Sequence, residues 1–215
     1  VRNMAWSAGT ITAVERKDLG IDTGVLLVVI QGTGLNQGRG LPELIEALKI
    51  TPGVHLLVIG SGDAISEIRK RIDENDLAGH VTILPNMPWP EMIRFTKTCD
   101  AGISLDKPVS INQRLSLPNK LFDYISSGIP VIASALPEIS AIIERYGCGM
   151  TVDEVSPSAV AEALIKLRDN RDLLALLKKN AGTASGELTW EREREKEAAL
   201  FRKAIQSAMR KNDGK

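Results

Sequence analysis

The chain has 215 residues, of which 25% are charged, and its 27 basic and 27 acidic side chains balance to a net charge of zero. This length suffices to bury one sizeable core, and the balanced charge excludes the bulk positive field that favours nucleic acids or anionic membranes. Apolar runs stay below the about 18 residues that a membrane-spanning helix needs, and the start lacks the pattern of a signal peptide. Cys99 and Cys148 lie in apolar surroundings without CxxC spacing, which indicates reduced, buried thiols. We therefore expect a soluble, cytoplasmic protein.

Residues 1–24 show little periodicity apart from a short helix that a glycine ends, and we interpret them as a linker stub. Residues 25–30 form a short, continuous, β-branched run, which is typical of a strand buried on both faces of a parallel sheet. Strands and amphipathic helices then alternate. We expect strands at 25–30, 55–59, 81–84, 101–105, 131–134 and 147–152, with helices at 41–50, 63–75, from 90, from 118 and at 136–145. This order predicts an α/β fold with a doubly wound, Rossmann-like parallel sheet.

Two further helices are expected at 156–169 and 171–181, with no strand between them. From Trp190 the sequence becomes a long helix whose charges alternate in sign. The chain thus divides into the stub 1–24, a Rossmann-like domain 25–186 and a C-terminal helix and tail 187–215.

A glycine-rich segment follows the first strand. Gly32, Gly34, Gly38 and Gly40 permit a pyrophosphate to approach backbone amides closely, and Arg39 adds a positive charge just before the next helix. The alternative interpretations are a turn that merely links strand to helix, and a solvated arginine.

Residues 116–134 read as a loop, a helix, a tight turn and a buried strand. Pro118 suits the beginning of a helix, and a helix N-terminus at the end of a parallel sheet is a ready anion site. Asn119 and Lys120 lie at this N-terminus, while Asp123, one turn deeper, could accept hydrogen bonds from two sugar hydroxyls. Asn119 has a second interpretation as a residue that caps the first turn, and Lys120 as a surface lysine.

Five motifs, in this order along the chain, resemble family 4 glycosyltransferases of the GT-B fold. They are VVIQG at 28–32, LLVIGSG at 56–62, DAGISL at 100–105, PNKLFDY at 118–124 and GIPVIA at 128–133. The resemblance covers about residues 25–155 and implies the C-terminal, donor-binding half of a retaining hexosyltransferase. A complete enzyme of this family is about twice as long, and its long terminal helix packs on the other domain. We therefore expect this chain to be inactive without an N-terminal acceptor-binding domain.

The resemblance assigns roles to single residues. Arg39 and Lys120 would stabilise the departing diphosphate without a metal, together with Gly32, Gly34 and Asn119. Asp123 stands where the family carries the second glutamate of its E-x7-E motif, which is associated with ribose hydroxyls.

The first glutamate of that motif is missing, because Leu115 stands eight residues before Asp123. Asn112, in what looks like a longer loop over 109–116, is our candidate for the donor-sugar contact; its alternative is an ordinary loop residue. The loops after the second and third strands are candidates for the nucleobase site. Their residues are Gly60, Gly62, Pro85 and Asn86.

The expected partner is a UDP-, GDP- or ADP-sugar, with no cofactor, no metal and no nucleic acid. Peripheral membrane association of the full-length enzyme and the identity of its acceptor stay open. Two alternatives remain: an NAD(P)-binding Rossmann domain, because Gly32-x-Gly34 follows a strand, and a non-catalytic module that binds sugar nucleotides. The sequence contains no Gly-Lys-Ser/Thr phosphate loop.

Overall fold

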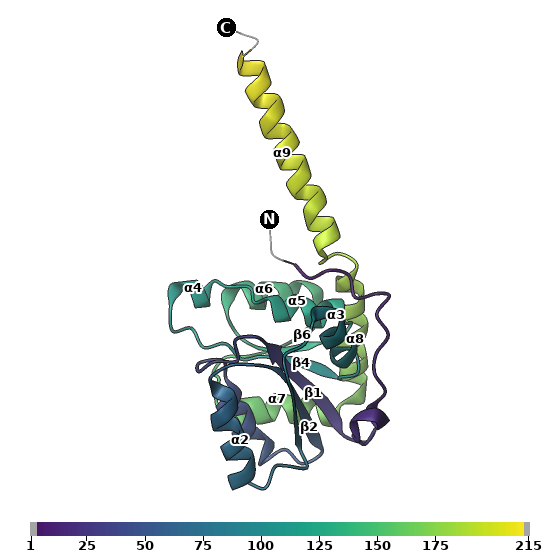
Figure 1. The fold of residues 1–215 in the computed structure, drawn as a ribbon, viewed down its shortest axis with the longest axis vertical. Coiled ribbons are helices and arrows are strands. Elements are labelled where there is room, and N and C mark those ends of the chain that lie inside the picture. Colours follow the sequence, from purple (N-terminus) through teal and green to yellow (C-terminus); the bar gives the residue numbers. More distant parts are fainter. Residues whose placement is uncertain (1–3, 213–215) are drawn as a thin grey trace.

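In the computed structural model, which describes residues 4–212 and the side chains of residues 4–205, one sheet of six parallel strands has the order β3-β2-β1-β4-β5-β6 (Figure 1). The strands are β1 (Leu26–Gly32), β2 (Val54–Gly60), β3 (Val81–Leu84), β4 (Ala101–Ser104), β5 (Val131–Ser134) and β6 (Gly149–Val152). The helices are η1 (Arg16–Leu19), α1 (Leu41–Leu48), α2 (Ala64–Glu74), α3 (Trp89–Thr96), α4 (Ile111–Arg114), α5 (Asn119–Ser126), α6 (Pro137–Tyr146), α7 (Pro157–Asp169), α8 (Arg171–Ser185) and α9 (Trp190–Asn212). The doubly wound Rossmann-like prediction is confirmed.

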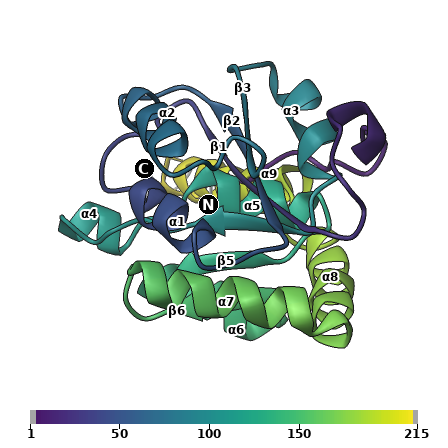
Figure 2. The same cartoon turned by 90° about the horizontal axis from the view of Figure 1, so that it is seen from below.

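Helices cover both faces of the sheet (Figure 2). Successive side chains of a strand point to opposite faces, so β1 contributes Val28 to one core and Val29 to the other. The first core includes side chains of α1, α2 and α7, and the second includes side chains of α3, α5 and α6, while α8 contributes to both. Burial on both faces explains why the strands read as continuous apolar runs.

The sheet opens between β1 and β4, where the direction of winding reverses. These strands pair at Val28–Ala101 and Val29–Gly102. Beyond this point, the fully buried Tyr124 of α5 bridges them, because its hydroxyl accepts the Gln31 N–H at 3.2 Å and donates to the Ile103 carbonyl at 3.1 Å. A Cβ atom on Gly102 would lie 2.2 Å from the Tyr124 ring. Tyr124 therefore fixes the position of α5 at the carboxyl edge of the sheet.

The N-terminal segment and the beginning of α9 meet near α5. The Trp190 N–H of α9 donates to the Ala5 carbonyl at 2.8 Å, and the rings of Trp6 and Trp190 pack edge to face at 6.4 Å. Ala8 N–H donates to the Ser126 hydroxyl at 2.9 Å. The rest of α9 extends away from the sheet (Figure 1), as the expected long C-terminal helix. The domain boundaries at residues 24 and 186 stay predictions.

Most expected elements lie within two residues of their predicted ends. One difference is Pro118, which precedes α5 in extended conformation instead of beginning it. Another is the expected loop over 109–116, which contains the short helix α4, with the Ser110 hydroxyl accepting the Gln113 N–H at 3.2 Å.

Cys99 and Cys148 are buried free thiols, as predicted. Among the described residues, no helix combines the length and the apolarity needed to cross a bilayer.

Candidate functional site

The glycine segment after β1 packs against the segment that follows β4. Gly40 adopts a φ of 70°, and a Cβ atom there would lie 2.4 Å from Cβ of Leu105. The Lys107 N–H donates to the Gly38 carbonyl at 2.9 Å, which ties the two segments together. This close approach brings Arg39 from one segment beside Asp106 from the other.

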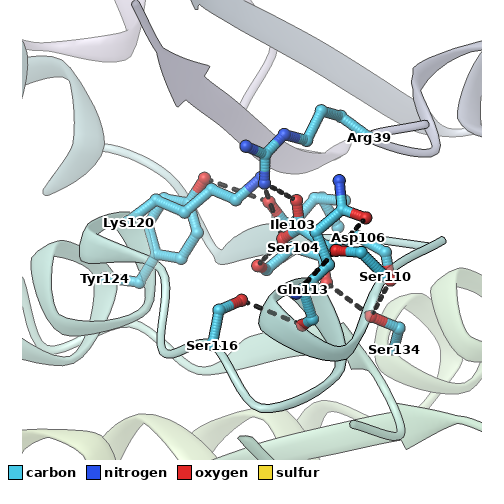
Figure 3. A network of polar contacts seen from close by, with 10 residues as sticks. All are labelled: Arg39, Ile103, Ser104, Asp106, Ser110, Gln113, Ser116, Lys120, Tyr124 and Ser134. Carbon is cyan, nitrogen blue, oxygen red and sulfur yellow. Dashed lines mark hydrogen bonds and ion pairs between the residues drawn. The ribbon is translucent and has the colours of Figure 1, made fainter. Parts of the chain in front are cut away.

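Asp106 forms the centre of a polar network (Figure 3). One carboxylate oxygen, Oδ1, pairs with the Arg39 guanidinium, and the other, Oδ2, lies 3.4 Å from Nζ of Lys120. The Ser104 hydroxyl donates to Oδ2 at 3.0 Å, and the Ser134 hydroxyl donates to the Asp106 carbonyl at 2.7 Å. Three separate segments of the chain thus contribute the charges of this network.

These charges shift each other's protonation. Burial opposes ionisation of Asp106, but Lys120 and Arg39 outweigh this effect and hold the pKa of the carboxyl below its usual value. Burial lowers the pKa of the Lys120 ammonium, Asp106 counteracts the lowering, and Arg39 adds to it. Arg39, Lys120 and Asp106 together carry a formal net charge of +1.

A cleft of about 420 Å³ opens beside this network, between the end of β1 and the N-terminus of α5. The structure brings together here five residues that the sequence singled out, Gly32, Gly34, Arg39, Asn119 and Lys120. The remaining lining comes from residues 31, 33, 35 and 116–118. Two cations and the positive end of the α5 dipole face one concave surface, which suits an anion with several oxygens.

Asp123 lies one turn deeper, outside the lining of the cleft, and is 7% exposed. Trp89 Nε1–H donates to its Oδ1 at 2.8 Å, and Gln31 Nε2–H donates to its Oδ2 at 3.2 Å. Gln31 in turn accepts the Thr96 hydroxyl at 2.6 Å. Burial raises the pKa of Asp123 against the lowering effect of the Trp89 and Gln31 hydrogen bonds. Each carboxylate oxygen keeps further acceptor capacity.

The other candidate residues lie outside the cleft lining. Pro85 and Asn86 are exposed after the edge strand β3, and Asn112 is exposed on α4. Gly60 and Gly62 have a packing role, since a Cβ atom would lie 1.9 Å from the Gly32 carbonyl oxygen or 2.3 Å from that of Leu35.

Sequence reasoning missed Asp106, Gln31 and Trp89. Asp106 follows β4 directly at the carboxyl edge, beside the point where the winding reverses, and this position could have identified it. Gln31 is a polar residue at the end of an apolar strand and is 1% exposed, so its amide needed partners. Trp89 offered no comparable signal.

Within residues 4–205, no three His, Cys, Asp or Glu side chains lie together in a way that could hold a metal ion.

Comparison with known proteins identifies the family of this chain. The family model described as "Glycosyl transferases group 1" matches residues 12–183. The chain belongs to this family. Among curated relatives, chitobiosyldiphosphodolichol beta-mannosyltransferase of Candida glabrata is 27% identical over 169 residues, covering 72% of this chain and 36% of the relative. The amylovoran biosynthesis glycosyltransferase AmsK of Erwinia amylovora is 24% identical over 145 residues, covering 66% of this chain and 36% of AmsK.

Solved structures share the fold of this group 1 chain. Sucrose-phosphate synthase from Thermosynechococcus elongatus superposes with a TM-score of 0.77 at 18% identity, covering 95% of this chain and 52% of that chain. Anabaena HepE, solved in complex with UDP and glucose, gives a TM-score of 0.72 at 16% identity, covering 92% of this chain and 55% of that chain. The group 1 chain thus spans about 36% of the curated relatives and about half of these solved chains.

Proposed function

We propose that this chain is the donor-binding, C-terminal half of a retaining, family 4 type hexosyltransferase, and that it holds the diphosphate of a nucleotide sugar. The observation that carries the proposal is the single cleft lined by Gly32, Gly34, Arg39, Asn119 and Lys120. Membership of the group 1 family and the likeness to HepE, which was solved with UDP, support it.

The chemistry follows from the charges in the cleft. When the bond between the anomeric carbon and the diphosphate oxygen breaks, its electron pair stays on that oxygen and the nucleoside diphosphate gains negative charge. Arg39, Lys120 and the N-terminus of α5 stabilise this charge without a metal. The anomeric carbon then bonds to a hydroxyl oxygen of the acceptor, a glycan, a lipid or another molecule, and the hydroxyl proton passes to the departing diphosphate. An N-terminal domain outside this chain binds the acceptor.

The remaining roles extend the proposal around the cleft. Asp123 accepts ribose hydroxyls in addition to Trp89 and Gln31, and Asn112 contacts the donor sugar. The loops with Gly60, Gly62, Pro85 and Asn86 frame the nucleobase. The isolated chain binds the donor but does not transfer its sugar.

Calorimetric titration tests this function directly. We expect saturable binding of one diphosphate series among UDP, GDP, ADP and their sugars, with UDP the first choice because HepE was solved with it. The matching monophosphate should bind roughly tenfold or more weakly, because it loses charge-assisted hydrogen bonds worth about 1.5–3 kcal/mol each. Binding of NADH in place of every diphosphate, or no binding at all, would contradict the proposal.

A further inference from the structure

The two cations of the cleft differ in their access to water. The Lys120 side chain is 10% exposed and that of Arg39 is 36% exposed. A nearly desolvated ammonium beside a guanidinium tends to lose its proton, since burial and the neighbouring charge both disfavour its positive form. A compensating negative charge is therefore needed to keep Lys120 cationic before an anion arrives.

Asp106 supplies this negative charge, because its carboxylate contacts both Lys120 and Arg39. The charges that act on Lys120 are Asp106, from the segment after β4, and Arg39, from the segment before α1. The other nearby carboxylates are engaged elsewhere: Glu43 of α1 pairs with Lys107, and Asp123 accepts Trp89 and Gln31.

The Asp106 carboxylate is held in place by its own partners. Asp106 is 2% exposed, Ser104 of β4 donates to its Oδ2, and Ser134 of β5 donates to its carbonyl. A rigid carboxylate between two flexible cationic side chains restricts both of them to one geometry before ligand binding, which reduces the entropy lost on binding.

We propose that Asp106 is a positioning residue of the diphosphate site, which keeps Lys120 protonated and orients Lys120 and Arg39 along one wall of the cleft. The inference rests on the proposed function, because it describes how the same site is prepared for its anion. Asp106 itself carries the same sign of charge as the ligand and acts through the two cations.

The pH dependence of diphosphate binding distinguishes this role from a structural one. Once the terminal phosphate is fully ionised, above about pH 7, affinity is constant while Lys120 of the free protein is protonated. It falls by roughly tenfold per pH unit above the pKa of Lys120, where binding must first take up a proton. In Asp106→Asn the counteracting charge is lost, so the fall begins at a lower pH than in the wild type.

The experiment is calorimetric titration with UDP, or with whichever of GDP and ADP the wild type binds, from about pH 6 to about pH 10. Between about pH 7 and about pH 9, Asp106→Asn should lose affinity by a larger factor than the wild type does. Asp106→Glu returns the carboxylate and should return the curve toward the wild type.

Asp100→Asn is the matched control, because Asp100 also bridges an arginine and a lysine, Arg16 and Lys178, at the opposite end of β4. It should leave the pH profile of binding unchanged. An Asp106→Asn curve parallel to the wild type would overturn the inference, as would an equal shift in Asp100→Asn. If Asp106→Asn does not fold, Ser104→Ala should produce a smaller shift in the same direction, and no shift would count against the inference. Absence of diphosphate binding by the folded wild type refutes the proposed function instead.

Discussion

Arg39 and Lys120 come from segments 81 residues apart in the sequence and share one buried carboxylate. Lys70 of α2 has different surroundings, since its side chain is 75% exposed and pairs with Glu74 within its own helix. The effect of replacing a cleft cation on ligand affinity can therefore be compared with the effect of replacing Lys70.

We expect Arg39→Ala and Lys120→Met each to weaken nucleoside diphosphate binding roughly 10- to 100-fold, because hydrogen bonds to charged groups contribute about 1.5–3 kcal/mol each. Lys70→Ala should leave the affinity unchanged. Calorimetric titration at neutral pH gives the comparison, and an equal loss in all three variants would remove the special role of the cleft cations.

Asp100 provides a prediction about stability instead of binding. It accepts Lys178 at 2.7 Å, Arg16 at 2.5 Å and the Leu27 N–H at 2.9 Å. Burial opposes its charge, but these partners hold its pKa below the ordinary value of 3.8. A lowered native pKa means that the carboxylate stabilises the fold fully above pH 3.8 and loses this contribution as the pH falls through the native pKa.

Asp100→Asn should therefore lower the free energy of unfolding by about 1.5–3 kcal/mol at neutral pH, the scale of charged hydrogen bonds. The difference from the wild type should shrink in acid below the ordinary carboxyl pKa. Urea denaturation at neutral and acidic pH measures both values; a difference that grows in acid would show the wrong sign.

At the level of elements, the position of α5 depends on the contact between Tyr124 and Gly102. Gly102→Ala places a methyl group 2.2 Å from the ring, and both residues are buried. We expect a loss of about 1–3 kcal/mol in stability from overpacking. Because α5 carries Asn119 and Lys120, nucleotide affinity should fall as well. Gly79→Ala is the control, since its added methyl meets nothing within 4 Å; an equal effect there would contradict the explanation.

The alternation of apolar strands and amphipathic helices predicted the elements and their order because these periodicities are local. The gathering of Gly32, Gly34, Arg39, Asn119 and Lys120 at one edge was predictable as well, since the ends of parallel strands meet there. The pairing of Asp106 with Arg39, 67 residues away, was not, because it depends on how closely Gly40 approaches Leu105. The hydrogen bond from Trp89 to Asp123 depends in the same way on the packing of α3 beside α5.

Across the whole molecule, α9 has two parts with different surroundings. Glu193 near its beginning is buried, whereas Leu200, Phe201 and Ile205 are exposed at 60%, 63% and 57%. Removing residues 199–215 should change the thermal midpoint by less than about 2 °C, because residues 199–205, the part of this segment whose side chains are described, are all exposed. Removing residues 188–215 also deletes the buried Leu188 and Thr189 and should lower the midpoint clearly. Calorimetry of both truncations checks this, and equal midpoints would contradict it.

The Tyr124 hydroxyl has a kinetic consequence. In the interior of a sheet an amide proton is shielded by a neighbouring strand, but the Gln31 N–H is held by a side chain on α5. Its exchange with deuterium therefore reports the opening of the gap between β1 and β4, and not the fraying of a strand pair. The same helix begins at the diphosphate site, so a ligand that holds α5 in place should slow the exchange of the Gln31 amide. The exchange rate of this single amide then measures how often α5 moves away from β1.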